Sequence, residues 1–163
     1  MHKEIVFSGF GGQGVLFAGE LLAYTAMKNG YYVTWMPSYG PEMRGGTASC
    51  TVIISGDEIG SPVVRNPQAA VVMNLPSMNK YEPILKPGGV LVVNQSLVNR
   101  NFKRKDLQTV LIPANDIAES ISEKKFSNMV MIGALLDSMS IFNIESVKSA
   151  LEEELPERHR QLL

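Results

Sequence analysis

Residues 9–14 read Gly-Phe-Gly-Gly-Gln-Gly, and this glycine turn constrains the fold more than any other segment. It follows a short β-branched and aromatic run at residues 5–7 and precedes a helix-forming stretch rich in Leu, Ala and Met at residues 15–27. In a strand–turn–helix unit the glycines permit a tight turn and let the backbone come close to a ligand. The free N–H groups at the helix N-terminus then point at an anion. The pattern therefore predicts a phosphate-binding turn in an α/β domain.

The segment after this unit indicates that the ligand whose phosphate binds at the turn is not NAD. A dinucleotide-binding fold usually carries Asp or Glu about 20 residues beyond the glycines, at the end of the second strand, where it holds the ribose hydroxyl. The second strand is expected at residues 31–36, and it ends in Trp35 and Met36. The nearest acid and base, Glu42 and Arg44, follow several turn-forming residues. The glycine turn thus lacks the usual nicotinamide adenine partner.

Residues 36–47 form a second unusual loop, in which two prolines fix the backbone, glycines release it, and Glu42 and Arg44 lie two positions apart. If the strand before this loop runs parallel to the first strand, the loop emerges at the same sheet edge as the glycine turn. Ligands of open α/β sheets bind at the carboxyl ends of the strands, so the two loops would converge. The other interpretation is a structural loop in which Glu42 and Arg44 pair with each other or with solvent.

The length of 163 residues suits one domain, and 45% apolar with 19% charged residues is ordinary for a globular protein. A formal net charge of −1 gives no global field to attract nucleic acid or an anionic membrane. No apolar run reaches the roughly 18 residues that span a bilayer, and the N-terminus lacks a signal-peptide pattern. We therefore expect a cytoplasmic protein with neither a nucleic-acid nor a membrane partner.

Metal and redox centres are not expected in this chain. The single cysteine, Cys50, excludes an internal disulfide and a cysteine-ligated iron–sulfur cluster. Two histidines, His2 and His159, are too few for an ordinary zinc site. Cys50 lies within an apolar strand pattern, which predicts a buried and inert thiol.

The chain alternates expected strands and helices, which predicts an α/β fold: a single domain whose parallel or mixed sheet carries helices on both faces. The strands are expected at residues 3–9, 31–36, 47–54, 69–75, 90–94 and 109–112, and the helices at 13–29, 77–85, 114–122, 127–140 and 144–154. Pro37 is expected to close the second strand.

Two expected helices are apolar on nearly all sides. The helix at residues 14–28 has few polar positions, and residues 128–136 carry no charge. One interpretation is that both helices lie within the core of the domain. The other is that one face packs on the sheet and the opposite face on a partner chain.

The motifs together resemble one family. Gly-x-Gly-Gly-Gln-Gly-Val opening a helix, followed by Ser-Tyr-Gly-Pro-Glu-Met-Arg-Gly-Gly at residues 38–46, is similar to the gamma subunit of the 2-oxoacid:ferredoxin oxidoreductases. Residues 59–62, 85–89 and 128–134 fit the same family in order, so the resemblance covers about residues 4–140. In detail it is nearer the 2-oxoglutarate and ketoisovalerate enzymes than the pyruvate type. Family members usually continue past residues 155–163, so the C-terminus looks short.

The resemblance implies a subunit of a hetero-oligomeric enzyme that oxidatively decarboxylates a 2-oxoacid to an acyl-coenzyme A. Thiamine diphosphate and the iron–sulfur clusters would reside in partner subunits (alpha, beta and delta), with ferredoxin as the electron acceptor. This subunit would have no catalytic residue and no metal, and it would help to bind coenzyme A and close the active site. The thiamine motif Gly-Asp-Gly is absent, since Gly56-Asp57 is followed by Glu58. By resemblance, the coenzyme A site comprises Gly9, Gly11, Gly12, Gln13, Gly14, Val15, Ser38, Arg44, Gly45 and Asn128.

Three further points stay open at the level of sequence. Residues 99–105 are basic with one aromatic residue, which fits a solvated loop or a contact for an acidic partner. Tyr39 fits either a packing role or a proton donor. The competing function is a free-standing oxidoreductase that binds a nucleotide or flavin at the same glycine turn.

Overall fold

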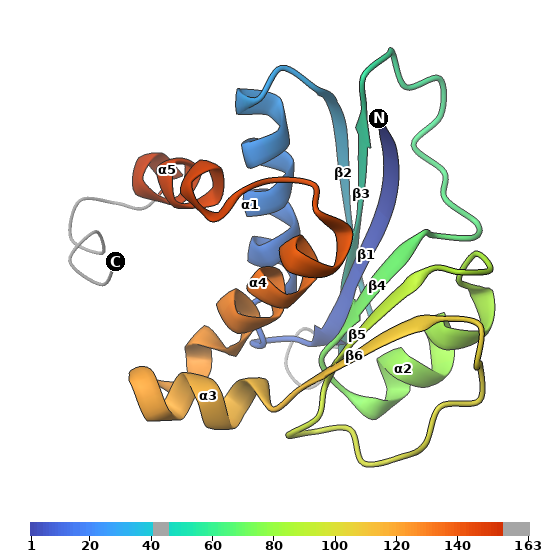
Figure 1. The fold of residues 1–163 in the computed structure, drawn as a ribbon, viewed down its shortest axis with the longest axis vertical. Coiled ribbons are helices and arrows are strands. Elements are labelled where there is room, and N and C mark those ends of the chain that lie inside the picture. The colour runs from blue at the N-terminus through green and yellow to red at the C-terminus, as the bar shows by residue number, and fades with distance from the viewer. Residues whose placement is uncertain (41–45, 155–163) are drawn as a thin grey trace.

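A computed structural model describes residues 1–40 and 46–154 as an α/β domain built on one six-stranded sheet (Figure 1). The strand order is β2-β3-β1-β4-β5-β6. The strands are β1 (His2–Phe10), β2 (Tyr32–Tyr39), β3 (Thr47–Ser55), β4 (Ala69–Val72), β5 (Val90–Asn94) and β6 (Gln108–Ile112). No helix within the described residues is long and apolar enough to cross a membrane.

The sheet is mixed. β1, β4, β5 and β6 are parallel neighbours, whereas β3 runs antiparallel to both β1 and β2. Because β1 and β2 each oppose β3, they point the same way, and their carboxyl ends lie at the same edge of the sheet. The orientation assumed for the second strand is therefore confirmed.

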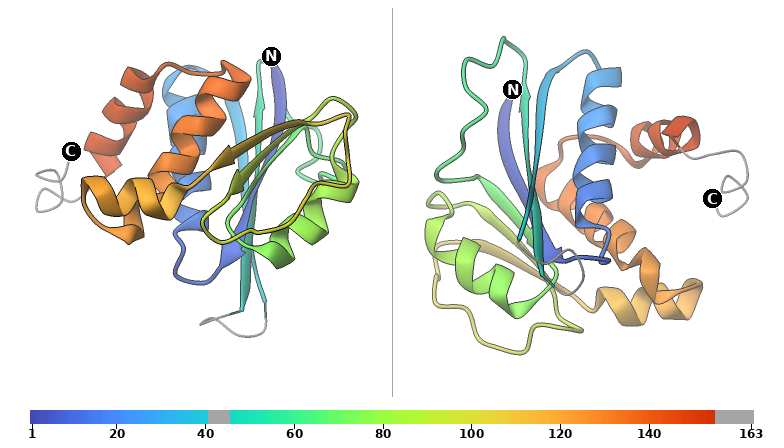
Figure 2. Two further views of the ribbon diagram at one scale, coloured as in Figure 1. Left: turned by 60° about the horizontal axis from the view of Figure 1, so that its bottom comes forward. Right: turned by 180° about the vertical axis from the view of Figure 1, so that it is seen from behind.

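Helices cover both faces of the sheet, as the alternation of elements predicts (Figures 1 and 2). The helix α1 (Val15–Lys28) lies with α4 (Ser127–Met139) and α5 (Ile144–Glu154) on one face, and α2 (Leu75–Tyr81) lies on the other. The helix α3 (Ala114–Ile121) follows β6 and packs against α4. Two short 3-10 helices, η1 (Glu82–Ile84) and η2 (Lys124–Phe126), complete the order.

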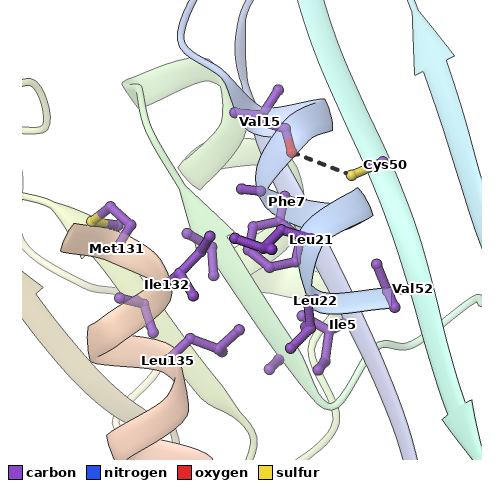
Figure 3. Packing of buried hydrophobic residues seen from close by; sticks show 14 of the residues in the cluster. Ile5, Phe7, Val15, Leu21, Leu22, Cys50, Val52, Met131, Ile132 and Leu135 are labelled. Atoms are coloured by element: carbon purple, nitrogen blue, oxygen red, sulfur yellow. Dashed lines mark hydrogen bonds between the residues drawn. The ribbon is translucent and has the colours of Figure 1, made fainter. Parts of the chain in front are cut away.

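Each face of the sheet buries its own apolar core. The larger core lies under α1 and α4, where Phe7 and Leu21 pack with residues of α4 such as Leu135 (Figure 3). The smaller core lies under α2 and includes Val6, Met78 and Leu91. Alternate residues of β1 therefore enter opposite cores, as the twofold period of a strand requires.

The apolar helices lie largely in the domain's own core. In α1 only Glu20, Met27 and Lys28 are exposed, and in α4 only Asp137 is exposed. α1 contacts three strands as well as α4 and α5. Both helices thus pack mainly on the domain's own sheet and helices, and Leu16, Phe17, Met129 and Val130 are half-buried.

Two expected boundaries are wrong. Pro37 does not close the second strand, because β2 continues to Tyr39. β2 is an edge strand, where a residue without an N–H group is tolerated. The fourth strand ends at Val72 rather than at residue 75, because Asn74 begins α2: its side chain accepts a hydrogen bond of 2.9 Å from the Ser77 N–H. The expected helix at 77–85 is accordingly α2 followed by η1.

Candidate functional site

The glycine turn lies at the point of the sheet where the strand order reverses. From β1 the chain proceeds through α1 to β2 on one side, whereas β4, β5 and β6 extend the sheet on the other. Such a switch point leaves a crevice outside the carboxyl ends of the two central strands, which are here β1 and β4. The turn at residues 11–14 borders this crevice from β1, and Met73 and Asn74 border it from β4.

Hydrogen bonds within the turn fix its shape. The side-chain oxygen of Gln13 accepts from the Phe10 N–H at 2.6 Å, and the Gln13 N–H donates to the Phe10 carbonyl at 3.1 Å. The Gln13 side-chain amide also lies 3.5 Å from the Met73 carbonyl, toward which it donates. Gln13 therefore links the turn to β4, and its role is to shape the turn.

Gly9 and Gly14 are required by close packing. A Cβ atom on Gly9 would lie 2.4 Å from the Gln13 Oε1 atom and 2.8 Å from the Met73 Cβ atom. A Cβ atom on Gly14 would lie 2.4 Å from the Asn128 Nδ2 atom. Both glycines therefore admit neighbouring protein groups.

Gly12 is different, because a Cβ atom there would meet nothing within 4 Å among the described residues. Its φ of +93° belongs to the left-handed region that favours glycine. The N–H groups of Gly12 and Gly14 donate to no atom of the described residues. Within the described residues, Gly12 thus combines open space with an N–H that has no acceptor.

The N-terminus of α1 completes an anion-binding geometry. Gly14 precedes the helix with φ +70°, no side chain caps it, and the first turn contains no acidic residue. Free N–H groups and the partial positive charge of the helix end favour a phosphate there. The residues present therefore fit a phosphate group. Val15 contributes only backbone, because its side chain is buried and its carbonyl accepts from the Cys50 thiol at 3.4 Å (Figure 3).

Asn128 supports the turn from α4. Its side-chain amide donates to the Gly14 carbonyl at 3.2 Å, and its Oδ1 atom accepts from the Met129 N–H at 3.0 Å. Asn128 is itself buried. The structure therefore places the predicted residue beside the turn, where it holds the backbone in position.

The second loop approaches the glycine turn at its described end. The Gly11 N–H donates to the Gly46 carbonyl at 2.9 Å, so the two loops meet at one sheet edge. Arg44 and Gly45, like Glu42, lie outside the described residues. Ser38 is exposed on β2, two strands away from β1 and opposite Ser49. Figure 2 shows the ends of β2 and β3 extending past the neighbouring strands.

Cys50 and Tyr39, which the sequence analysis also considered, differ in their exposure to solvent. Cys50 is buried, and burial raises the pKa of its thiol to about 12, as an inert thiol requires. The side chain of Tyr39 is 59% exposed at the end of β2. No group of three or more metal-ligating side chains occurs among residues 1–40 and 46–154.

Two residues of interest had no role in the sequence argument. Asn74 is buried at the switch point, and its Nδ2 atom lacks a hydrogen-bond partner in the described chain. The sequence does carry a signal for it, because Asn followed by a proline in the first helical turn is typical of a helix N-terminus. Glu82 is 1% exposed and binds the basic loop at residues 100–104, which no local pattern reveals.

A family model described as pyruvate ferredoxin/flavodoxin oxidoreductase matches residues 4–163. The chain belongs to this family. This confirms the resemblance drawn from the two loop motifs.

The chain is similar to named subunits of 2-oxoglutarate synthase and ketoisovalerate oxidoreductase. The 2-oxoglutarate synthase subunit KorC of Methanothermobacter marburgensis is 36% identical over 163 residues, which cover 96% of this chain and 88% of the relative. The ketoisovalerate oxidoreductase subunit VorA of the same organism is 37% identical over 133 residues, 82% of this chain. The chain spans only 28% of the length of VorA.

Solved structures share the fold. The gamma subunit of a keto/oxoacid ferredoxin oxidoreductase from Geobacter sulfurreducens superposes with a TM-score of 0.83 at 31% identity, covering 98% of this chain and 90% of that one. The 2-oxoglutarate:ferredoxin oxidoreductase of Magnetococcus marinus, solved with 2-oxoglutarate, coenzyme A and succinyl-CoA, gives a TM-score of 0.85 at 20% identity over 94% of this chain and 27% of that one. The second likeness concerns the fold alone.

Proposed function

We propose that this chain is the coenzyme-A-binding subunit of a 2-oxoacid:ferredoxin oxidoreductase, and that it binds the coenzyme A diphosphate at the glycine turn. The observation that carries the proposal is the backbone of Gly12, just before the N-terminus of α1: among the described residues, nothing lies within 4 Å of a Cβ placed there and no atom accepts from its N–H. Membership of the oxidoreductase family and similarity to KorC support the enzyme class.

In this proposal, some of the described residues face the ligand and others support the turn. Gly12, Gly14 and the first N–H groups of α1 would face the diphosphate. Gln13 and Asn128 would hold the turn rigid from β4 and α4. Arg44, which lies outside the residues that the structure describes, would supply positive charge to a phosphate or to the substrate carboxylate.

In this proposal, the partner subunits carry out the decarboxylation and the electron transfer. Thiamine diphosphate bound there supplies decarboxylation of the 2-oxoacid, and iron–sulfur clusters pass the electrons to ferredoxin. This chain positions the thiol acceptor, coenzyme A, and helps to exclude water from the acyl group. Alpha, beta and delta subunits are the proposed partners.

The first experiment is affinity purification of the tagged chain from its native cells, followed by an assay of the captured complex. We expect larger subunits to co-purify, together with 2-oxoacid oxidation that depends on coenzyme A. The isolated chain should show no such activity even with thiamine diphosphate added. Activity of the isolated chain would overturn the subunit assignment.

A second experiment separates coenzyme A from the competing nucleotide and flavin ligands. The purified complex is titrated with coenzyme A, NAD and FMN, and binding is followed by calorimetry. The turn lacks the carboxylate that anchors an adenosine ribose after the second strand. NAD should therefore bind more weakly than coenzyme A, and FMN should bind more weakly because it has one phosphate and no diphosphate for the turn. Preferential binding of FMN or NAD would favour the free-standing oxidoreductase.

A further inference from the structure

A second candidate ligand site lies at the opposite edge of the sheet from the glycine turn. A cavity of about 380 Å³ opens between the end of α2 and the loop that joins β5 to β6. The contact of the Lys86 N–H with the Pro67 carbonyl places this region beside the start of β4, at the amino edge. Figure 1 shows α2 and the β5–β6 connection lying on the face away from α1. The cavity is lined by Asn79, Glu82, Pro83, Arg100, Lys103 and Arg104.

Glu82 organises this cavity from within the protein. Its carboxylate accepts from the Arg100 guanidinium at 2.5 Å and from the N–H groups of Lys103 and Arg104 at 2.5 and 3.0 Å. Burial acts to raise the pKa of Glu82, but the Arg104 N–H, the Arg100 side chain and the Lys103 N–H outweigh it and lower the pKa. The carboxylate is therefore ionised at neutral pH, and it fixes the loop against α2.

Arg104 forms a fixed wall of the cavity. Its guanidinium binds Asp106 at 2.7 and 2.5 Å, and one of its nitrogens lies within 3.4 Å of the carbonyls of Glu82, Pro83 and Leu85. These partners neutralise the charge of Arg104 and use most of its donors. Arg104 therefore shapes the cavity more than it attracts a ligand.

Lys103 retains an accessible charge, whereas the unpaired donor of Arg100 is buried. The two terminal nitrogens of Arg100 bind Glu82 and the Asn101 carbonyl, but its Nε atom is enclosed and has no partner in the described chain. Lys103 is exposed, and its ammonium pairs with no carboxylate of the described residues. After the pairs with Glu82 and Asp106 are counted, the lining keeps the positive charge of Lys103.

We propose that this cavity binds a small phosphoryl anion, either inorganic phosphate or a phosphate monoester. Its volume lies in the range of small-molecule sites, which begins at roughly 300 Å³. The Lys103 ammonium supplies the charge, the Asn79 amide supplies a directed donor, and Pro83 gives an apolar wall for an organic group. A guanidinium held in place by a buried carboxylate is pre-organised for an oxyanion.

The test is an NMR titration of the ¹⁵N-labelled full chain with inorganic phosphate, with sodium chloride used to match ionic strength. Saturable shifts are expected at the amides of residues 100–104. A parallel titration with glycerol 3-phosphate separates the sources, because tighter binding of the ester identifies an organic phosphate and equal or weaker binding identifies free phosphate.

Three variants distinguish a built site from general surface charge. Lys103→Ala should weaken phosphate binding about tenfold, as expected for the loss of one charge-assisted contact. Arg100→Lys keeps a cation beside Glu82 but removes the planar guanidinium that binds both Glu82 and the Asn101 carbonyl in the cavity wall, so it should also weaken binding. Lys105→Ala, an exposed lysine of the same loop that does not line the cavity, should bind within about twofold of the parent protein. Absence of saturable shifts, or equal effects of Lys103→Ala and Lys105→Ala, would overturn the proposal.

Discussion

The side-chain amide of Asn128 donates to the backbone carbonyl of Gly14 across 114 positions of sequence, at 3.2 Å. The same amide occupies the position that a Cβ atom of residue 14 would need. The start of α4 therefore packs directly on the glycine turn, and the turn is held from outside its own strand–turn–helix unit. Residue 14 must be glycine for two reasons, its φ of +70° and this contact.

Gly14→Ala should destabilise the fold more than Gly30→Ala. Both positions have positive φ, and a left-handed non-glycine residue costs roughly 1–2 kcal/mol. Only at Gly14 does the new Cβ meet another group, and overpacking adds about 1–3 kcal/mol. Urea unfolding of the two variants measures the difference, and equal losses would show that α4 yields without cost.

Gly12→Val should impair coenzyme A and leave folding little worse than Gly30→Val. Neither residue has an atom within 4 Å of its missing Cβ in the described chain, so the two variants share only the conformational cost of positive φ. At Gly12, however, the side chain would fill the space proposed for the diphosphate. We expect the Michaelis constant for coenzyme A in the assembled enzyme to rise at least about tenfold, the effect of losing one or two charged hydrogen bonds. A normal constant in Gly12→Val would place the site elsewhere.

Patterns among neighbouring residues were enough to predict many of the strands and helices of this fold. The glycine turn between a β-branched run and a helix former predicted β1 and α1, and continuous apolar runs predicted the buried strands β4 and β5. These elements follow from periodicity and from glycine conformation, which neighbouring residues determine. The boundary errors at Pro37 and Asn74 arose where a local signal has two meanings. Proline can end a strand or lie on a sheet edge, and Asn can end a strand or begin a helix.

The sequence could not separate the roles of the predicted site residues, because those roles depend on distant contacts. Gly9 and Gly14 are glycines because Met73 and Asn128 lie against them, whereas a Cβ on Gly12 would meet none of the described residues within 4 Å. Glu82 carries no distinctive signal in the sequence, where it simply precedes Pro83. Its burial depends on a loop that begins 18 residues later, so no window of local sequence reveals it.

Cys50 should resist thiol reagents in the folded protein. Its sulfur is buried between β3 and α1, and its pKa of about 12 keeps the thiolate scarce at pH 8. Because the thiolate is the reactive form, modification by a disulfide reagent should be slow in buffer and complete in urea, where the pKa returns to about 8.5. One equivalent of fast-reacting thiol in buffer would contradict the buried position.

Glu82→Gln should destabilise the protein at neutral pH by about 3 kcal/mol, the range for breaking a buried ion pair from one side. The amide would leave Arg100 without its counter-charge and would turn an NH₂ group or a weaker acceptor toward the N–H groups of Lys103 and Arg104. Glu58→Gln, which changes an exposed acid, is the matched control and should alter the free energy of unfolding by less than about 0.5 kcal/mol.

The difference between the parent protein and Glu82→Gln should depend on pH in one direction. The pKa of Glu82 is lowered in the folded state, so its carboxylate stabilises the fold above the unfolded-state value of about 4.3. This stabilisation is lost as the pH falls from there through the lower folded-state value, where the carboxylate takes up a proton. Urea unfolding at pH 7, 5, 4 and 3 should therefore show a gap that is constant down to about pH 5 and shrinks below it. A gap that persisted unchanged to pH 3 would mean that the variant loses shape complementarity rather than charge.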